Sequence, residues 1–405
     1  MIDIEEKGYV KYVLFSSLYF AEGIEIIVAM AIVPVYLVDQ GVSTAVATLV
    51  AGIAMLPWAL KFIWGGMADY FIKYGRKRFI VLGGLIAAGS FFMLAVIDPG
   101  VALLPFAVFL FIGHCGTGFL DVSADAWAIQ TTQEHERGKI NGVMFAGLFI
   151  GQAVGSSLFA SIAGSAGYGV AFMTIGGMIF LLVLFPLFVH ENILVKIRQK
   201  VAALLVGEFK KKTTQIVSVF LPALAISSGL VAVVVPLFLK EILELDVSQI
   251  GIIVAMFPLG TMVGAVLGGV TTDRWGRKIN LYFFVGLSII FSASLAVANT
   301  WQSVAIMFGI VGFLRGGWYA AMGALLMDIT NPKIGATQYS LLTSFANAGE
   351  IVGGAVAGSL IVLLGYTSVF LFCGWLFGPA LLILYFIRPK ATFAITSEGV
   401  IEDAM

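Results

Sequence analysis

Charged residues are scarce in this sequence, and so are the residue types that bind metals or form disulfides. Only 11% of the 405 residues are charged, and the formal net charge is zero, whereas soluble domains carry about 25% charged residues. The three histidines lie far apart without a His-Glu-x-x-His pattern, and only two cysteines occur. The sequence therefore predicts no metal site, no cofactor and no disulfide framework, and its balanced charge does not point to nucleic acid as a partner.

Long hydrophobic runs make up most of the chain. Hydrophobic residues account for 60% of it, and the mean hydropathy is +1.03. Apolar runs of about 20 residues match the ~30 Å hydrocarbon core of a bilayer, where the backbone must satisfy its own hydrogen bonds as helix. We predict an all-α membrane protein with twelve spans, at residues 11–38, 44–67, 78–97, 101–127, 139–164, 168–189, 214–239, 247–270, 279–298, 302–327, 336–363 and 367–387.

The positive charges predict the orientation of these spans, because cytoplasmic loops are enriched in Lys and Arg. Of the 23 Lys and Arg residues, only Lys240 is predicted on the side away from the termini, and Lys61 and Arg315 lie inside spans. We therefore expect both termini on the cytoplasmic side of the cell membrane. The acidic N-terminus lacks the basic segment of a signal peptide, so we expect no cleavage there.

One short pattern occurs twice, in the turn after the second and the eighth predicted spans. It comprises Gly65, Asp69, Gly75 and Arg76 in the first copy and Gly269, Asp273, Arg274, Gly276 and Arg277 in the second. The glycines would allow close helix approach, the acid would suit a helix N-terminus, and the cations could bind acids on a neighbouring span. We predict a conformational latch at the cytoplasmic edge. Simple anchoring by the cations is the alternative.

Other repeats divide the chain into two halves. Residues 151–156 (GQAVGS) match residues 349–354 (GEIVGG), and residues 113–116 loosely match residues 312–316. Repeats of six spans in one orientation place a substrate site near the membrane midplane between them. The linker mixes apolar residues with cations, which suits an amphipathic surface helix. We predict a six-helix bundle at residues 1–190, this linker at 191–213, a second six-helix bundle at 214–390 and a cytoplasmic tail at 391–405.

Polar and ionisable side chains inside the spans are the candidate site residues, because a charge at the bilayer centre costs ~2.5–3.5 kcal/mol. The candidates for proton coupling are Glu22, Glu25, Asp121 and Glu350, and those for substrate binding are Lys61, His114, Gln152, Arg315 and Asn347. Glu22 and Glu25 are three positions apart, on one helix face. Four acids meet two cations, so some acids lack a charged partner, and burial favours their neutral form. The alternatives are acids that hydrogen-bond between helices and cations that only neutralise Glu350 or Asp121.

The duplicated loop pattern and the six-span repeat resemble the major facilitator superfamily. Within it, three segments resemble the branch of muropeptide permeases (AmpG-type) and acetyl-CoA transporters: residues 57–64 (PWALKFIW), 121–127 (DVSADAW, followed by ERG at 136–138) and 336–342 (ATQYSLL). The resemblance implies a secondary transporter that works by alternating access, with proton-linked uptake of bulky polar solutes, either sugar–peptide muropeptides or an acyl-CoA. We expect a monomer that moves a small polar or anionic solute. Tyr70 departs from the pattern, because an arginine usually follows the first loop aspartate.

Competing functions remain open at this point. Proton-antiport efflux of drugs or metabolites is the main alternative, although Gln152 stands where efflux antiporters usually carry a proline after the glycine. A receptor with the same fold that does not transport, or a membrane-embedded enzyme, would belong to another class. No nucleophile–base pair supports an enzyme. The expected partners are thus a small-molecule substrate, protons and the lipid bilayer.

The predicted orientation can be tested by labelling single cysteines with a membrane-impermeant reagent. Cysteines at Gly41 and Asp98 should react from outside intact cells, because both positions are predicted in external loops. A cysteine at Gly207, in the predicted cytoplasmic linker, should react only after the cells are permeabilised. The reverse pattern would contradict the orientation that the cations predict.

Overall fold

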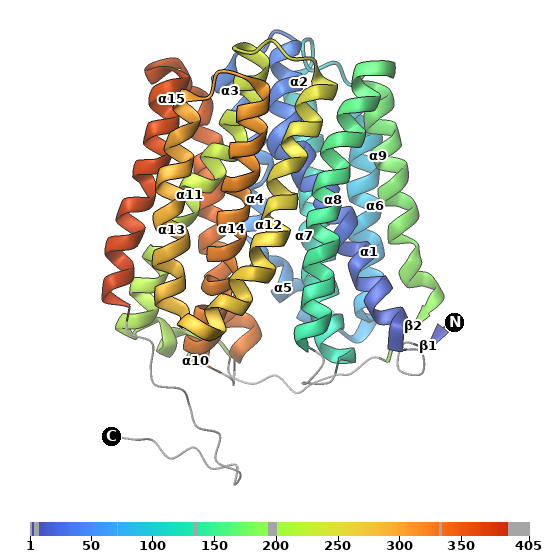
Figure 1. Ribbon diagram of the computed structural model, residues 1–405. Coiled ribbons are helices and arrows are strands. Elements are labelled where there is room, and N and C mark those ends of the chain that lie inside the picture. Colours follow the sequence, from blue (N-terminus) through green and yellow to red (C-terminus); the bar gives the residue numbers. More distant parts are fainter. Residues whose placement is uncertain are drawn as a thin grey trace.

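The chain folds into a bundle of long helices that stand side by side (Figure 1). The computed structural model describes residues 2–3, 8–70, 72–132, 137–192, 201–331 and 334–387. Strand β1 and the end of helix α15 lie at the same end of the bundle in Figure 1. We call this end the terminal face and the opposite end the far face. A short parallel pair, β1 (Ile2–Asp3) and β2 (Val189–His190), lies at the terminal face.

The first half of the chain supplies six spans. Its helices are α1 (Gly8–Ile27), η1 (Val28–Ile32), α2 (Val33–Asp39), α3 (Thr44–Ala54), α4 (Leu56–Ala59), α5 (Lys61–Tyr70), η2 (Ile72–Tyr74), α6 (Arg76–Leu94), α7 (Leu103–Thr131), α8 (Arg137–Ala166), α9 (Tyr168–Val183) and η4 (Phe185–Phe188). The remaining helices are α10 (Val201–Phe209), α11 (Lys212–Glu241), α12 (Val247–Trp275), α13 (Arg277–Ser294), η5 (Leu295–Val297), α14 (Trp301–Ile329) and α15 (Gly335–Phe386).

The predicted all-α membrane fold is confirmed. Ten helices are long and apolar enough to cross a membrane. The longest, α15, contains two spans that meet at Gly365, where the backbone leaves the helical region. Helices α3, α4 and α5 together form one more span. The described residues therefore contain the twelve spans that the hydrophobic runs predict.

The second span is broken, which the sequence did not predict. It was expected as one helix over residues 44–67, but turns at Met55 and Leu60 divide it into α3, α4 and α5. Pro57 lacks the N–H that would continue the helical bonds. Its carbonyl instead accepts hydrogen bonds from the Leu60 amide (3.1 Å) and the Trp64 indole (3.0 Å). As a result Lys61 is the first residue of α5, directly after the break, rather than a residue inside a regular helix.

The first span also departs from a regular α-helix. Five residues, Val28–Ile32, form a π-helical segment immediately before α2, which has a proline in its first turn. A single π-helical turn accommodates an interruption in the helical hydrogen bonds and is common near functional sites. This segment separates the acidic part of α1 from the end of the span at Asp39.

The stronger of the two repeated glycine patterns has the same packing role in both halves. Gly151 and Gly155 of α8 pack against the backbone of α1, and Gly349 and Gly353 of α15 pack in the same way against α11. A Cβ atom added at any of these positions would collide with backbone atoms of the neighbouring helix. Small residues allow such close contact between membrane helices. The match between residues 151–156 and 349–354 therefore reflects equivalent helix pairs.

The weaker glycine match has no common packing role. Gly116 of α7 lies against Gly83 of α6. Gly312 and Gly316 of α14 instead pack on α12. These glycines therefore contact the third span in the first half and the eighth span in the second half.

Four glycines mark equivalent turns in the two halves. Gly75, Gly167, Gly276 and Gly365 have φ angles of +83°, +90°, +83° and +74° and ψ angles of 157°, 159°, 158° and 161°. This region of backbone space is essentially restricted to glycine. Each of the four residues begins the helix that follows it, so the turns before the third, sixth, ninth and twelfth spans have one common geometry.

Replacement of Gly276 by alanine tests this requirement. A Cβ at Gly276 would meet no atom within 4 Å, so any loss of stability comes from the backbone conformation, at a cost of about 1–3 kcal/mol. Gly269 is the matched control, because it also has open space around it but lies within helix α12. Thermal unfolding in detergent should show a lower Tm for Gly276→Ala and an unchanged or higher Tm for Gly269→Ala. Equal Tm values for both variants would contradict the interpretation.

Candidate functional site

Three acids of the first half gather around one ammonium group. Lys61 Nζ lies 2.6 Å from Asp121 Oδ2, and Glu22 and Asp125 are within electrostatic range of the same ammonium. The Tyr19 hydroxyl donates a hydrogen bond to Asp125. Lys61 is 18% exposed, whereas Asp121 is 1% exposed. This cluster contains more acidic groups than its cation can balance, an arrangement typical of proton relays in membranes.

Glu25 occupies a separate polar site inside the first bundle. It accepts a hydrogen bond from Thr117, and His114 Nδ1 lies 3.6 Å from Glu25 Oε1. The Trp58 indole points its N–H at the same Nδ1 atom, at 3.3 Å. Because an indole only donates, Nδ1 is an acceptor and the imidazole of this arrangement is neutral. Glu22 and Glu25, predicted on one helix face, thus have different partners: Glu22 lies near Lys61, and Glu25 contacts Thr117 and His114.

The second half presents one cation held by one acid. Arg315 Nη2 lies 2.6 Å from Glu350 Oε1, and Arg315 Nε donates to Ser228 Oγ at 2.8 Å. The guanidinium also lies over the rings of Phe257 (5.7 Å) and Tyr319 (5.4 Å). Arg315 is 15% exposed and Glu350 is 20% exposed, so solvent reaches a pair that lies in the middle of two spans. The sequence left open whether Arg315 pairs with Glu350, and the structure brings them together.

Two tyrosines lie between the charged groups of the two halves. Tyr319 is within electrostatic range of Arg315 and Glu350 in its own half and of Lys61 and Glu22 in the other. Tyr339 is similarly within range of Lys61. The clusters around Lys61 and Arg315 therefore face each other. Sequence reasoning missed both tyrosines, although Tyr319 follows Arg315 by one helical turn, which places the two side chains on one helix face.

Asn347 and Gln152, both predicted as substrate ligands, have different surroundings. Asn347 Nδ2 donates a 3.2 Å hydrogen bond to the carbonyl of Trp58 in the other half. That carbonyl lies next to the break in the second span. Because the break removes the amide that a regular helix would supply, Asn347 donates to the carbonyl instead. Gln152 is half-buried, and within the described part of the chain its side chain forms no hydrogen bond. Asn347 thus links the two halves, and a binding role for either residue stays a prediction.

The far face is closed by four polar contacts that form two equivalent sets. Asp39 binds Lys240 (2.5 Å) across the halves and Tyr168 (2.6 Å) within its own half. Glu241 binds Thr44 (2.7 Å) across the halves and Tyr366 (2.8 Å) within its own. We call these six residues the far-face seam. Asp39 and Glu241 end the first and seventh spans, and each tyrosine directly follows one of the four turn glycines.

Helix backbones also approach each other closely beneath the far-face seam. Thr48 of α3 donates to the Ala355 carbonyl (3.3 Å) and accepts from the Gly358 amide (3.1 Å) of α15. On the other side of the bundle, Ser248 of α12 donates to the Ala160 carbonyl of α8 (3.3 Å). The Asn347–Trp58 hydrogen bond lies at the depth of the helix break, and the other contacts between the halves named here lie towards the far face. The halves are thus held together on that side.

The duplicated loop pattern lies at the terminal face, but its predicted contacts are only partly present. An added Cβ at Gly65 or Gly269 would meet no atom within 4 Å, but one at Gly268, beside Gly269, would collide with the backbone of Gly317 in α14. The expected close helix approach is therefore present in the second copy only. The side chain of Asp69 falls outside the described part of the chain. Asp273 is 81% exposed and lies 3.8 Å from Arg277, which binds Asp328 more closely at 3.0 Å.

The acid at the start of the third span comes from elsewhere in the chain. Glu191 accepts hydrogen bonds from the backbone amides of Arg76 and Lys77, the second at 3.0 Å. These are the first two residues of α6, so the carboxylate caps a helix N-terminus, where negative charge is favoured. Sequence reasoning had assigned that kind of contact to the loop aspartates. Gly75 is the N-cap of α6, as Gly276 is for α13, while Arg274 is exposed.

Comparisons with known proteins agree with the fold and with the repeat. The sequence is 26% identical over 416 residues to a putative transporter AmpG 4 of Rickettsia conorii, covering 95% of this chain and 98% of that protein. It is 22% identical over 362 residues to the anhydromuropeptide permease of Escherichia coli K12, covering 85% of this chain and 73% of that protein. The nucleoside transporter NupG has a similar structure, with a TM-score of 0.72 at 14% identity over 93% of this chain and 97% of that one.

The family profile of the Major Facilitator Superfamily matches the chain twice, over residues 15–221 and 216–398. Each match covers one of the six-span repeats, and together they include both charged clusters and both copies of the loop pattern. The family consists of multi-pass membrane transporters and not of enzymes. The chain belongs to the major facilitator superfamily and is a membrane transporter of this family.

Proposed function

We propose that this transporter takes up a polar solute bearing an anionic group, together with protons. The observation that carries the proposal is the pair of clusters at the midplane, where Lys61 and Arg315 face each other across Tyr319. Each cation is held by one of the acids Asp121 and Glu350. We propose that the solute binds there, between halves formed by residues 1–190 and 214–390.

The contacts of Arg315 suggest how solute and proton would be coupled. A guanidinium binds a carboxylate or phosphate through two parallel hydrogen bonds. A solute anion at Arg315 would compete with Glu350, which now occupies that position at 2.6 Å. The displaced carboxyl group would be left near the midplane without its cation, where the neutral, protonated form is favoured. Solute and proton would then bind together, which is the requirement for symport.

The rings around the two cations suggest that the solute is bulky. Trp58 lies under the Lys61 ammonium at 4.7 Å, and Phe257 and Tyr319 surround Arg315. Binding sites for small molecules are mostly apolar and aromatic, with a few polar groups that fix orientation. A sugar–peptide conjugate with a carboxylate would match such a site. The name of the Escherichia coli relative, anhydromuropeptide permease, agrees with that class of solute.

We further propose that the far-face seam is the gate that must open during transport. If the charge distribution predicts the orientation correctly, the terminal face is cytoplasmic and this conformation faces inward. Opening outward would break the Asp39–Lys240 and Thr44–Glu241 contacts. The loop pattern with Asp69 and Asp273 would then hold the terminal face closed.

Glu350→Gln tests the coupling. The amide keeps the shape of the side chain and can still accept from Arg315, but it cannot take up a proton. Purified protein in proteoliposomes should retain solute exchange and lose accumulation driven by a proton gradient, and the remaining transport should no longer depend on pH. Glu244→Gln is the matched control, because Glu244 is exposed near the far face. If gradient-driven uptake in Glu350→Gln kept the normal pH profile, coupling through this carboxyl group would be wrong.

Lys240→Gln tests the gate. The Asp39–Lys240 pair is partly exposed, with 27% of Lys240 accessible, so its loss should cost up to about 1 kcal/mol. That shifts the population of far-face-open molecules about fivefold. Spin labels on the exposed residues Val101 and Val297, one in each half, should report longer distances. Lys139→Gln at the terminal face is the control, and an unchanged distance distribution in Lys240→Gln would rule out a role for the pair in gating.

A further inference from the structure

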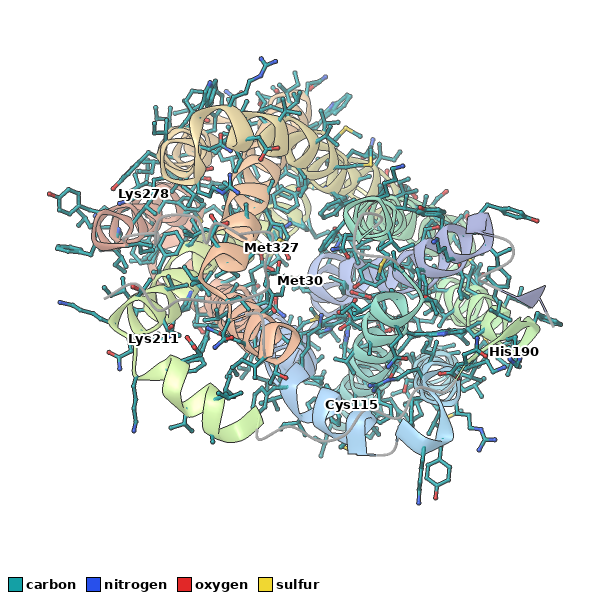
Figure 2. The ribbon with its side chains drawn as sticks, turned by 90° about the horizontal axis from the view of Figure 1, so that it is seen from below. Met30, Cys115, His190, Lys211, Lys278 and Met327 are labelled. Carbon is teal, nitrogen blue, oxygen red and sulfur yellow. The ribbon has the colours of Figure 1, made fainter. Side chains whose placement is uncertain are left out.

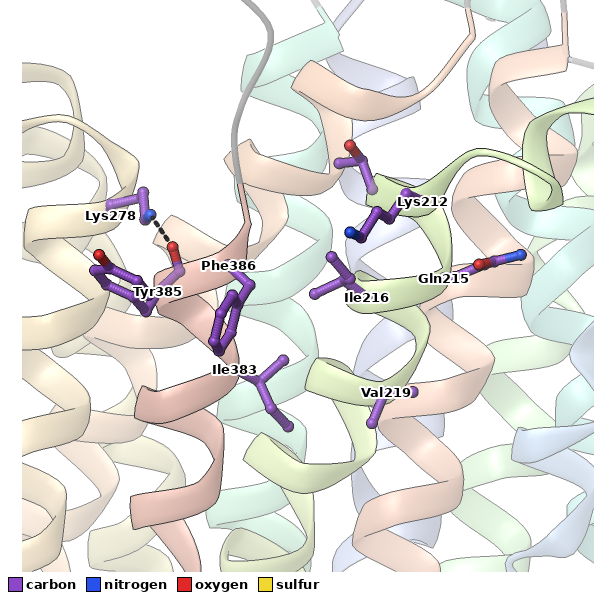
Figure 3. A pocket seen from close by; sticks show the side chains of 9 residues that line it. Lys212, Gln215, Ile216, Val219, Lys278, Ile383, Tyr385 and Phe386 are labelled. Atoms are coloured by element: carbon purple, nitrogen blue, oxygen red, sulfur yellow. Dashed lines mark hydrogen bonds between the residues drawn. The ribbon is translucent and has the colours of Figure 1, made fainter.

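A groove lies on the outside of the second half, at the terminal face (Figure 3). It has a volume of about 930 Å³ and lies between the first turns of α11, the start of α13 and the end of α15. Figure 2 shows Lys278, one of its residues, at the outer edge of the bundle and away from Met30 and Met327 near the centre. The groove is therefore distinct from the charged clusters at the midplane.

The walls of the groove are apolar. Ile216 and Val219 come from α11, and Ile383 and Phe386 come from α15. In Figure 3, the side chains of Ile216, Ile383 and Phe386 point into the space between the two helices. Val219 is 60% exposed and Phe386 is 64% exposed, so no other part of the described chain covers these walls.

The mouth of the groove is basic. Lys212 and Lys278 are among its lining residues, and none of the described lining residues is acidic. Lys278 donates one hydrogen bond, to the Tyr385 carbonyl at 3.2 Å, which leaves other N–H groups of its ammonium available. Lys212 forms no ion pair within the described residues, and its ammonium points towards the groove in Figure 3. Asp328 does not neutralise this mouth, because it binds Arg277 at 3.0 Å.

The lysines lie at the depth where lipid headgroups are found. Lys212 is the first residue of α11, and Lys278 is the second residue of α13. Tyr385 is 71% exposed and Trp275 is 44% exposed at the same end of the bundle. Exposed Tyr and Trp side chains typically mark the boundary between the hydrocarbon core and the headgroups. The apolar walls therefore extend from this boundary towards the acyl chains.

We propose that this groove binds an anionic phospholipid of the leaflet at the terminal face. Its phosphate lies between Lys212 and Lys278, and one acyl chain follows Ile216, Val219 and Ile383. Basic pockets between membrane helices bind anionic lipid headgroups in this way. Two uncompensated ammonium groups favour a lipid with net negative charge over a zwitterionic one. The bound lipid fills the gap between α11 and α15 and joins the first and last helices of the second half.

The test measures lipid binding to the purified full chain in neutral detergent. Phosphatidylglycerol should raise the Tm and appear as a retained ligand in native mass spectra, whereas phosphatidylcholine should do neither. The double variant Lys212→Gln/Lys278→Gln should bind phosphatidylglycerol about thirtyfold more weakly, because it loses both ammonium groups that would contact the phosphate. The control Lys73→Gln/Lys139→Gln removes the same charge from exposed positions of the first half at the same face and should bind normally.

A second variant tests the contribution of the acyl-chain contacts to binding, separately from that of the charges. Val219→Trp fills the apolar part of the groove, leaves both lysines in place and should also weaken phosphatidylglycerol binding. Glycerol phosphate, which lacks acyl chains, should not compete. If the double lysine variant and the control pair lost equal affinity for phosphatidylglycerol, overall surface charge would explain the effect and the proposal would be overturned. Competition by glycerol phosphate, or normal binding by Val219→Trp, would assign the site to a soluble phosphate and overturn the lipid assignment.

Discussion

A charged side chain in the middle of a bilayer needs an opposite charge and hydrogen-bond partners, and the centre of this protein is built around that requirement. Lys61 and Arg315 are the two cations inside the predicted spans, and Asp121 and Glu350 hold them at 2.6 Å each. Removing one member of a buried pair costs about 3–5 kcal/mol. The helices must therefore keep each pair intact or offer its members new partners, and a solute anion or a proton is such a partner.

The same energetic cost explains which parts of the site could be predicted from the sequence. Charges inside apolar runs are too expensive to occur without a reason, so Lys61, Asp121, Arg315 and Glu350 could be found without coordinates. Their pairing depends on helix rotation and on contacts between distant spans, which hydrophobic periodicity does not specify. The break at Pro57 was also beyond prediction, because Pro222, Pro236 and Pro258 lie inside unbroken helices.

The far-face seam could not be predicted from the sequence, because its charged residues occur where charges are inexpensive. Asp39, Lys240 and Glu241 lie at the ends of spans, where charged residues cost little and carry no signal in composition. The two acids, Asp39 and Glu241, are equivalent in the two halves. Each ends the first span of its half and binds the tyrosine that follows a turn glycine. A Gly-Tyr pair at residues 167–168 and again at 365–366 is a further repeat in the sequence, but it is too short to be noticed beside the loop pattern with Asp69 and Asp273 and the glycine patterns.

The hydrogen bond from Asn347 to the Trp58 carbonyl links opening of the protein to its hydration. That carbonyl is released by the helix break, and its donor lies on the other half at 3.2 Å. When the halves separate, the carbonyl loses this donor in a region where an unsatisfied polar group costs about 1–3 kcal/mol. Water or a hydroxyl group of the solute must replace it. In the proposed transport cycle, separation of the halves at this depth would thus be a wetting transition, and a dry interface would favour keeping them together.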